Sequence, residues 1–488
     1  MVPARFLHSF SRSLTVLAAG GSLTWIWISF CNFPGVFWNE GRFAAAAAFS
    51  RGWSVYPTAT EGVVNTWVYG PLPLIVLLPA TWFNTPTAAL IGAGAINTLV
   101  IAIPLVLTVW FWPGLQQKTP SGWSRFAVLA VLPILWPEYF WHSLFADSFV
   151  VAFGLLGNLM LIRHPKGSAL WISAGFATAA MACKQTAIGI PLAQVAWIGW
   201  TMGWRAGVHH ATRCVATGVA WGLAGVSVFG FHGMWFTMVE LPGRGYPWVD
   251  DIFGRLTAFP GRMLALIFVP VAIMVLFHRK IWHRDSPFLL PSLAYAACLL
   301  PGFAAFLKFG GSTNSIHSYS LWLPAALVAF NTAAITDEWR SKGTIGLTLL
   351  ALGMVGHNLY QSPARSLTPS IGHLYAAERL VEHLPHQVWF PWNPLVSLFV
   401  DQNYTHDEDG LLVRQLSGAP ISVEHFRRHM PRHYSAIAIP EIWSINRTIP
   451  PDQDAQIFQG WRLQTWNQPQ VLLPGATRIT VPTDVTDE

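Results

Sequence analysis

The segment from Leu14 to Phe33 reads LTVLAAGGSLTWIWISFCNF and contains no charged residue. Because a helix needs about 20 apolar residues to cross the hydrocarbon core of a bilayer, this segment predicts a transmembrane helix. Similar segments recur along the chain, and together they predict an α-helical polytopic membrane protein with about 11 transmembrane helices. The expected spans are residues 14–33, 87–112, 126–141, 147–162, 169–184, 187–204, 212–236, 263–278, 287–307, 318–335 and 343–360.

The composition is typical of a membrane protein. Of the 488 residues, 53% are hydrophobic and only 11% are charged, whereas a soluble domain carries about 25% charged residues. The 26 Trp and 31 Phe suit anchors at the membrane–water interface. The net charge of +6 does not indicate a nucleic-acid partner, because the basic residues of such a chain sort into cytoplasmic loops. The four cysteines are scattered in apolar segments, so no disulfide framework is expected.

The charges of the loops predict the topology. If the first span is an uncleaved helix with its N-terminus in the cytoplasm, every cytoplasmic connection carries at least two basic residues. These are Arg5 and Arg12, Lys118 and Arg125, Arg163 and Lys166, Arg205 and Arg213, Arg279, Lys280 and Arg284, and Arg340 and Lys342. The short outer turns at 142–146 and 185–186 carry none. This is the positive-inside pattern, so we expect an integral protein of the inner or plasma membrane with an extracytoplasmic C-terminal segment.

Two parts of the chain lie outside the expected spans. In the long first outer loop, residues 70–83 are too short to span and suit a re-entrant or surface-lying helix, and the Ala-rich residues 41–53 suit an interfacial helix. The C-terminal part is polar, with short strand-like runs at Val388–Phe390, Ser435–Ile439 and Val471–Leu473. We therefore expect a transmembrane domain over residues 1–360 and a small extracytoplasmic α/β domain over residues 361–488.

The polar residues that could carry chemistry gather near the predicted outer ends of the spans. They are Glu40 and Arg42 after the first span, Asp147, Lys184 and Gln185 at two outer turns, and Lys308, Asn314 and His317 in a later outer loop. An ionisable group at the centre of a spanning helix costs about 2.5–3.5 kcal/mol. A cluster of such groups on one side therefore indicates a polar cavity that opens outward.

Each of these residues also has a purely structural interpretation. Glu40 could be a solvated carboxylate that pairs with Arg42 or Arg51. Asp147 could cap the helix that follows it, because the first turn of a helix needs an oxygen acceptor. Lys184 could extend its ammonium group to the membrane interface while its alkyl chain stays in apolar surroundings.

The histidines have structural interpretations as well. His317 could hydrogen-bond within the turn-rich loop from Lys308 to Ser315. The histidines of the C-terminal part lack the spacing of metal ligands and are expected at the surface; they are His383, His386, His406, His425, His429 and His433. The sequence names no cofactor, and a divalent metal stays possible without a clear site.

Five short motifs, in their order along the chain, resemble the glycosyltransferase C superfamily. These polyprenyl-phosphate-sugar enzymes include protein O-mannosyltransferases and lipid A aminoarabinose transferases. The superfamily has an acidic pair followed by a basic residue, an aromatic residue and alanine; here that place reads Asn39-Glu40-Gly41-Arg42-Phe43-Ala44. The other places read Tyr69-Gly70-Pro71-Leu72-Pro73, Ala146-Asp147-Ser148, Lys184-Gln185-Thr186, and the loop from Lys308 to Asn314. The resemblance covers roughly residues 10–360.

The resemblance implies an inverting membrane glycosyltransferase of cell-envelope glycan biosynthesis. Such an enzyme moves a sugar from a polyprenyl-phosphate donor to a lipid, glycan or protein acceptor at the outer face of the membrane. The implied catalytic carboxylates are Glu40 and Asp147; the implied donor-phosphate ligands are Lys184, Arg42, Lys308 and His317; the implied substrate contacts are Asn39, Tyr69, Gln185 and Asn314. A carboxylate base contributes about 10²–10⁴-fold to such a reaction, and cations stabilise the leaving phosphate.

One departure from the superfamily concerns Asn39, which stands where the first acidic residue of the pair is expected. Either Glu40 or Asp147 takes the role of the base, or the activity is altered or lost, so an inactive scaffold of the same fold stays open. The alternative from another class is a transporter or flippase of a lipid or solute. Transporters often carry internal repeats and polar residues near the bilayer midplane, whereas this sequence shows no repeat and places its polar residues at one face.

Overall fold

The computed structural model is mostly helical and divides into two compact units. It describes residues 4–113, 122–136, 139–244, 248–257, 263–308, 311, 313–333, 337–361, 371–430, 436–440, 456–458, 461–465, 470–472 and 478–480. The first unit comprises Met1–Phe30, Asn97–Leu223 and Trp248–Leu367, and the second comprises Cys31–Ile96, Ala224–Pro247 and Thr368–Glu488. Much of the first expected outer loop thus shares a unit with the C-terminal segment. The expected domain boundary after residue 360 adjoins residues 362–370, which lie outside the described residues, and it stays a prediction.

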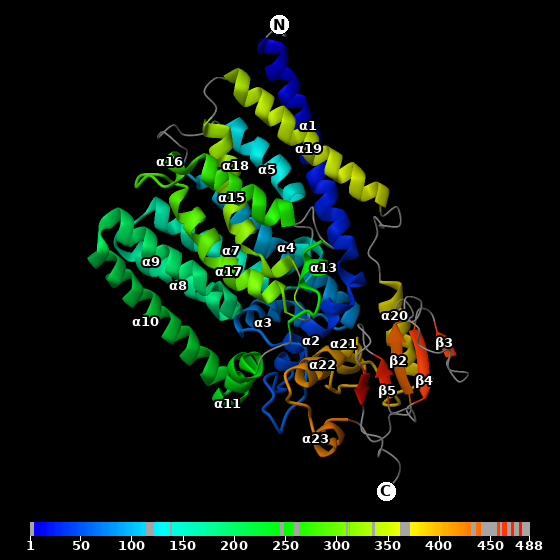
Figure 1. The fold of residues 1–488 in the computed structure, drawn as a ribbon. Helices are drawn as coiled ribbons and strands as arrows, with labels where there is room; N and C mark the ends of the chain where they lie inside the picture. The colour runs from blue at the N-terminus through cyan, green and yellow to red at the C-terminus, as the bar shows by residue number, and fades with distance from the viewer. Residues whose placement is uncertain are drawn as a thin grey trace. The chain divides into compact units, whose positions relative to one another are not determined.

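The first unit is a bundle of helices (Figure 1). The elements that lie wholly or mostly in it are α1 (Ala4–Asn32), α4 (Pro86–Phe111), α5 (Gly122–Leu135), α6 (Tyr139–His142), α7 (Ala146–Arg163), α8 (Ser168–Cys183), η4 (Gln185–Ile188), α9 (Gly189–Met202), α10 (Trp204–Phe229), α13 (Ile252–Thr257), η6 (Leu264–Phe268), α15 (Val269–Leu276), α16 (His278–Ile281), α17 (Leu289–Phe306), η7 (Thr313–Ser315), α18 (Ser318–Ala333) and α19 (Asp337–Gln361).

Helices α7 and α8 form an antiparallel hairpin that determines where two charged residues meet. The two helices have 18 and 16 residues and pack along their length. The short connection between them ends at Gly167, whose φ of +62° suits a residue without a side chain. Because the helices are nearly equal in length, the first turn of α7 and the last turn of α8 lie at the same end of the hairpin. Asp147 therefore comes close to Lys184, the residue that follows α8.

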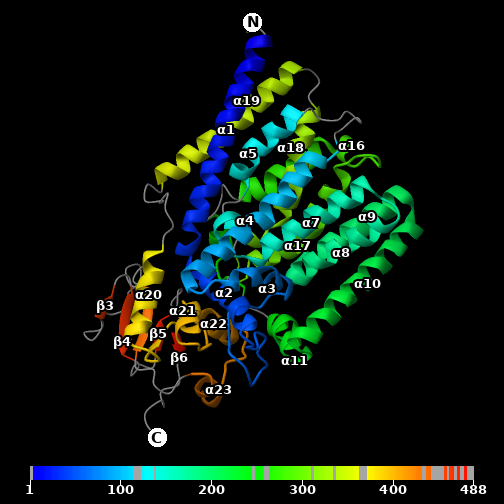
Figure 2. The same ribbon diagram turned by 180° about the vertical axis from the view of Figure 1, so that it is seen from behind.

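Helices α9, α17 and α18 pack beside this hairpin. Figures 1 and 2 show α7, α8 and α9 side by side, and α17 contacts both α9 and α18. The apolar core between them consists of Leu161, Ala193, Trp197, Ile198, Leu289, Leu290 and Ala294. Proline occurs inside several helices of this unit, at Pro104, Pro133, Pro301 and Pro324. Such prolines are tolerated in membrane helices because neighbouring helices and side chains satisfy the backbone groups that they free.

Among the residues that the structure describes, five helices are long and apolar enough to cross a membrane. They are Ser9–Gly35, Pro86–Phe111, Ala146–Arg163, Trp204–Phe229 and Leu289–Phe306. Shorter apolar helices occur near most of the other expected spans, among them Gly122–Leu135, Ser168–Cys183, Ser318–Ala329 and Ser341–Gly356. The helical class expected from the sequence is therefore confirmed, whereas the number of about 11 spans stays a prediction.

Several expected spans have different bounds in the structure, and α10 shows one cause. We expected residues 212–236, but α10 runs from Trp204 to Phe229. Gly203 and Gly230 flank this helix with φ of +99° and +80°. These left-handed backbone conformations end the regular helix on both sides, a constraint that hydropathy does not reveal.

The second unit combines short helices with a small sheet. Its elements are η1 (Phe33–Gly35), α2 (Phe37–Ser50), α3 (Leu72–Leu77), η2 (Leu78–Trp82), α11 (Phe231–Trp235), η5 (Phe236–Glu240), α12 (Leu241–Gly243), α20 (Gly372–His383), β1 (Val388–Trp389), α21 (Pro394–Val400), α22 (Glu408–Leu416), α23 (Val423–Arg428), β2 (Ala436–Pro440), β3 (Gln456–Phe458), β4 (Trp461–Thr465), β5 (Gln470–Leu472) and β6 (Arg478–Thr480).

Helix α2 is the centre of this unit. The run Ala44–Ala48 is fully buried, and α2 packs against α3, η2 and α21. The small alanine side chains allow this close packing on several sides of one helix. A helix was expected over residues 41–53, and the structure confirms a helix that begins earlier, at Phe37. The short helices α3 and η2 likewise occupy residues 70–83. For both segments, the position relative to a membrane surface stays a prediction.

The sheet of the second unit is covered by α20. Strand β1 pairs parallel with β2, β2 pairs antiparallel with β4, and β4 pairs antiparallel with β3; β5 and β6 form a separate antiparallel pair. Figure 2 shows α20 beside these strands. Residues of α20 at helical spacing pack with the sheet and α21 in one apolar core: Ala376, Ala377, Leu380, Val381, Val388, Phe390, Val396 and Ala438. Strands β1, β2 and β5 confirm the three strand-like runs of the sequence.

Candidate functional site

Four of the candidate site residues that the sequence singled out meet in the first unit. The fully buried carboxylate of Asp147 accepts hydrogen bonds from Lys184 Nζ at 3.0 and 2.8 Å. Its Oδ2 also accepts from Asn314 Nδ2 at 2.9 Å, and its Oδ1 lies 3.1 Å from His317 Nδ1. We call Asp147, Lys184, Asn314 and His317 the Asp147 cluster. Each carboxylate oxygen thus takes two hydrogen bonds, and the negative charge is neutralised by an ammonium group in a buried setting.

These contacts show that Asp147 does not cap a helix and that Lys184 does not extend to the membrane interface, which were their structural interpretations. Helix α7 begins without a side-chain cap, and the oxygens of Asp147 point to the cluster instead. Lys184 is only 8% exposed and forms an ion pair with Asp147, so it does not extend to an interface. Removing a charged group from water in this way costs several kcal/mol per charge, and only a well-bonded partner offsets it.

His317 has a second feature that the sequence did not reveal. The side chain is fully buried, and its Nδ1 atom faces Asp147 rather than the preceding loop. Among the described residues, its Nε2 atom has no hydrogen-bond partner. Buried polar atoms in proteins nearly always have a partner, so this nitrogen is suited to hydrogen-bond a ligand.

The other two motif residues of the first unit lie elsewhere. Lys308 Nζ lies 5.8 Å from the centre of the Trp248 ring, in a cation–π contact. Gln185 is exposed at the start of η4. The Asp147 cluster therefore includes four of the six candidate site residues that belong to this unit.

Glu40 is buried in the first turn of α2 and bonds to a histidine. The side chain is fully buried, and its Oε1 lies 3.1 Å from His373 Nε2, at the start of α20. Its Oε2 has no hydrogen-bond partner among the described residues. The expected partners were Arg42 or Arg51, but Arg51 instead lies over the Phe399 ring, at 3.9 Å. Glu40 is therefore not a solvated surface carboxylate.

The surroundings of Glu40 favour a proton-accepting role. Burial raises the pKa of Glu40, and the hydrogen bond and charge of His373 lower it in part. A carboxylate with a raised pKa accepts a proton more readily than an exposed one, which is a property that suits a general base. One oxygen is oriented by His373, and the other has no hydrogen-bond partner among the described residues.

Two other motif residues of the second unit, Asn39 and Tyr69, form hydrogen bonds that involve backbone carbonyl groups. Asn39 is fully buried and donates from Nδ2 to the carbonyl oxygen of Phe33 at 2.8 Å. Tyr69 accepts a bond at its carbonyl oxygen from the Tyr56 hydroxyl at 2.9 Å. Asn39 thus has a structural role. Its side-chain amide donates a hydrogen bond to a backbone carbonyl, which an ionised carboxylate could not do.

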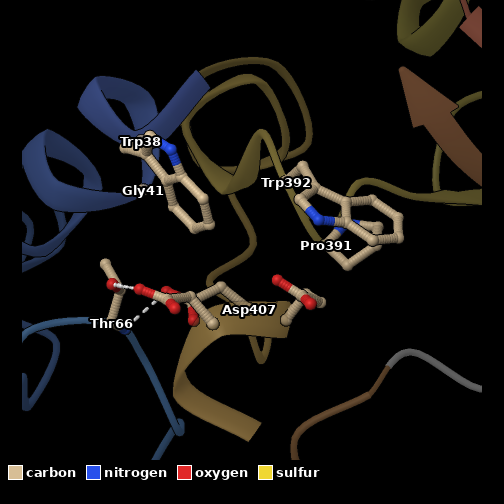
Figure 3. Close-up of a pocket in the computed structure, with 8 residues that line it drawn as sticks. Trp38, Gly41, Thr66, Pro391, Trp392 and Asp407 are labelled. Carbon is tan, nitrogen blue, oxygen red and sulfur yellow. Dashed lines mark hydrogen bonds between the residues drawn. The ribbon is translucent and has the colours of Figure 1, made fainter. Parts of the chain in front are cut away.

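A pocket lies in the second unit beside α2. Its open space is about 280 Å³, and it is lined by Trp38, Gly41, Thr66, Pro391, Trp392, Asp407, Glu408 and Asp409. Figure 3 shows the Trp38 and Trp392 rings flanking the space, with Asp407 below them. We call these eight residues the Trp pocket. The sequence motifs did not identify it, although the run Asp407-Glu408-Asp409 was a visible signal.

Thr66 joins two of the acidic residues of the Trp pocket. Its backbone N–H donates to Asp407 Oδ2 at 2.7 Å, and its hydroxyl donates to Asp409 Oδ2. Asp407 also caps α22, where Oδ1 accepts from the N–H of Gly410 at 2.7 Å. Burial and the charge of Asp409 raise the pKa of Asp407 well above its usual range. Burial raises the pKa of Asp409, and the charge of Arg42 lowers it in part.

Three histidines of the C-terminal part are clustered, which corrects the expectation that they lie at the surface. His406 is fully buried and His425 is 3% exposed; their ring centres and that of His429 lie 5.6–5.7 Å apart. Val64 donates its N–H to His406 Nδ1 at 2.9 Å. His383 and His386 are exposed as expected, and His433 lies outside the described residues. Within the described chain, no group of His, Cys, Asp and Glu has an arrangement that could hold a metal.

The histidine cluster holds the segment around Val64 through neutral rings. The backbone N–H of Gly62 donates to His429 Nε2 at 3.2 Å, and His425 Nε2 lies 2.7 Å from the Gly62 carbonyl oxygen. Burial, and then the neighbouring His425 and His429, lower the pKa of His406 to about 3. Its Nδ1 atom must therefore be unprotonated to accept the bond from Val64.

This arrangement predicts that the segment around Val64 loosens in acid. The folded chain keeps His406 neutral down to a pKa of about 3, whereas the usual value is 6.5. The stabilisation is thus present above pH 6.5 and is lost as the pH falls towards 3, by up to about 1.4 kcal/mol per pH unit. We expect His406→Asn, which keeps an acceptor, to show weaker pH dependence than the wild type.

Hydrogen–deuterium exchange of residues 62–66 between pH 7 and 5, corrected for intrinsic exchange, measures this effect. His383→Asn changes an exposed histidine and serves as the control. Equal pH dependence of protection in the wild type and in His406→Asn would contradict the role of His406.

Structural similarity, and not sequence similarity, relates this chain to known proteins. No protein-family model matches the chain, and no curated protein matches it. Among solved structures, the crystal structure of ArnT from Cupriavidus metallidurans bound to undecaprenyl phosphate is similar, with a TM-score of 0.52 and 12% sequence identity. The match covers 92% of this chain and 97% of ArnT.

At this identity the likeness shows the fold. ArnT, a lipid A aminoarabinose transferase, has the fold of the glycosyltransferase C superfamily, and the likeness extends over nearly the whole of both chains. Together with the apolar helices, this fold indicates an integral membrane protein. The chain therefore has the fold of this solved structure over most of its length, which bears out the fold that the five sequence motifs predicted.

Proposed function

We propose that the chain is an inverting glycosyltransferase that moves a sugar from a polyprenyl-phosphate donor to an acceptor at the outer face of the membrane. The acceptor hydroxyl attacks the anomeric carbon, the bond from that carbon to the phosphate oxygen breaks, and a carboxylate takes the hydroxyl proton. Polyprenyl phosphate leaves as an anion, and the configuration of the sugar inverts. Undecaprenyl phosphate, which is bound to ArnT in its crystal structure, is of the same lipid class as this leaving group.

The Asp147 cluster is the observation that carries this proposal. It places Lys184 and His317 around one buried carboxylate, next to the start of an apolar helix. Lys184 supplies a point charge, and His317 supplies a buried nitrogen without a protein partner among the described residues. Such groups stabilise the charge that develops on a leaving phosphate. We therefore assign phosphate binding to Lys184 and His317.

The hydrogen bonds of Asp147 and Glu40 favour different roles for these two carboxylates. Both oxygens of Asp147 are occupied by cluster donors, so this residue orients Lys184 and His317 and is a poor proton acceptor. Glu40 keeps one buried oxygen without a partner among the described residues and has a raised pKa. We assign the role of general base to Glu40. With this assignment, the reaction does not need a carboxylate at position 39, where the superfamily has its first acidic residue.

The substitution Glu40→Gln tests the base. We expect transfer from a polyprenyl-phosphate-linked sugar in membranes to fall by about 10²–10⁴-fold, while the protein still inserts. In the wild type, the raised pKa of Glu40 places the acid limb of the pH–kcat/KM profile above the range of an ordinary glutamate. Glu61→Gln, at a largely exposed carboxylate of the same unit, is the matched control. Full transfer by Glu40→Gln would remove Glu40 from this role.

Lys184 is tested by a pair of variants, because its loss alone leaves Asp147 buried without a counter-charge. We expect Lys184→Ala to raise the apparent KM for the lipid-linked sugar. The double variant Asp147→Asn with Lys184→Gln removes both charges and restores a neutral buried pair. If Lys184 contacts the phosphate, the double variant keeps the high KM. A return of KM to the wild-type value would show that Lys184 only balances Asp147.

A further inference from the structure

His373 brings the C-terminal part of the chain into contact with the carboxylate that we assign as the general base. It stands in the first turn of α20, and its Nε2 atom lies 3.1 Å from Oε1 of Glu40, in the first turn of α2. The side chain of His373 is 17% exposed, whereas that of Glu40 is fully buried. Helix α20 can therefore act on Glu40 directly, through this contact.

Contacts on two sides of α20 fix the place of His373. One side of α20 packs with α21 and the sheet in the apolar core that includes Ala376 and Leu380, and α21 packs in turn against α2. Elsewhere on α20, Glu378 accepts two hydrogen bonds at Oε1 from Thr87, one from its backbone N–H at 3.2 Å and one from its hydroxyl at 2.6 Å. These contacts hold α20 in the position from which His373 meets the carboxylate.

The contact between His373 and Glu40 is compatible with two protonation states, and only one of them suits a base. Either the Nε2–H group donates to an ionised carboxylate, or a protonated carboxyl group donates to a bare Nε2. In the second state Glu40 already holds a proton and cannot take another. In the first state Oε2, which has no hydrogen-bond partner among the described residues, can accept one. A general base at this position therefore requires a hydrogen on Nε2 of His373.

Burial works against the ionised form of Glu40, and His373 favours it. Removing a carboxylate from water stabilises its protonated form, whereas a hydrogen bond to the carboxylate stabilises the ionised form. Burial accordingly raises the pKa of Glu40, and the hydrogen bond and the charge of His373 lower it. Without His373 the pKa of Glu40 would lie higher still, so fewer molecules would carry an ionised base at the pH of the cell.

Other ionisable groups lie near α2, but they act elsewhere. They are Arg42 and Arg51 on the helix itself, Asp401 at the end of α21, and the acidic residues of the Trp pocket, Asp407, Glu408 and Asp409. The segments η1, α3, η2 and α21, which pack against α2, contain no titratable side chain. The charge of Arg42 acts on Asp409, and Arg51 lies over a phenylalanine ring. The charge that changes the pKa of Glu40 is that of His373.

We infer that His373 is a positioning residue for the general base: its Nε2–H group holds Oε1 of Glu40 and keeps the buried carboxylate ionised, so that Oε2 takes the proton of the acceptor hydroxyl. In this step the O–H bond of the acceptor breaks and an O–H bond to Oε2 forms, while the hydrogen on Nε2 stays on the ring. The inference rests on the proposed function for the identity of the reaction. Beyond that function, it makes the C-terminal part of the chain a component of the catalytic centre.

Infrared titration of the full chain tests the inference without turnover. The purified protein in detergent is titrated with acid, and the carbonyl band of protonated Glu40 is isolated by subtracting the spectrum of the same protein with Glu40→Gln. His373→Phe keeps a ring without a donor, and His373→Gln keeps an N–H donor. We expect the midpoint of Glu40 to move to higher pH in His373→Phe and to lie between that value and the wild-type value in His373→Gln. His383→Gln changes an exposed histidine of the same helix and should titrate as the wild type does.

The pH dependence of transfer separates this role from a purely structural one. At pH 7 we expect kcat/KM of His373→Phe to fall by about ten- to a hundredfold, the range for losing a hydrogen bond to a charged group. The loss should shrink at higher pH, because Glu40 then ionises without its donor. His373→Gln should restore most of the transfer. A histidine that only supports the fold would instead lower kcat/KM by the same factor at every pH.

Two results would overturn the inference. One is an infrared midpoint of Glu40 that is the same in His373→Phe as in the wild type. The other is a loss of transfer in His373→Phe that is equal at every pH and that His373→Gln does not restore. The infrared result does not depend on transfer, so the two proposals can fail separately. A shifted midpoint in a protein whose wild type transfers no sugar would support the contact and contradict the proposed function.

Discussion

The buried ion pair between Asp147 and Lys184 is the interaction on which the first unit depends. A carboxylate at the start of an apolar helix is costly unless a partner neutralises it. The α7–α8 hairpin supplies that partner because its two helices are nearly equal in length, so the residue after α8 meets the first turn of α7. Asn314 and His317 complete the shell from the segment before α18. Stability and the proposed phosphate chemistry thus draw on the same four side chains.

In the second unit, buried polar groups are hydrogen-bonded by histidines and by a carboxylate that caps a helix. Glu40 is oriented by His373, whereas His406 stays neutral so that it can accept a backbone N–H. Asp407 joins the Thr66 backbone to the start of α22. These contacts tie the first expected outer loop to the C-terminal part, and they explain why polar residues are buried in a unit that is otherwise built on the alanines of α2. One oxygen of Glu40 keeps no hydrogen-bond partner among the described residues.

The sequence predicted those features that local pattern determines. Apolar runs located most helices, short motifs named Glu40, Asp147, Lys184 and Asn314, and a position near the outer end of a span named His317. The helix ends at Gly203 and Gly230 depend on backbone conformation, which hydropathy does not contain. His373 lies 333 residues after Glu40, and His406 bonds to a segment 342 residues earlier. Such partners are set by the packing of segments that lie far apart in the sequence. They cannot be recognised from a single sequence.

We propose that this protein transfers a sugar from a polyprenyl-phosphate donor. Mass spectrometry of glycolipids and surface glycans, in cells with and without the gene, tests it most directly. Loss of the protein should accumulate a polyprenyl-phosphate-linked sugar and remove the mass of one sugar from a surface glycan or glycolipid. Re-expression of the wild type should reverse both changes. Unchanged levels of every polyprenyl-phosphate-linked sugar, together with unchanged surface glycans, would contradict the account.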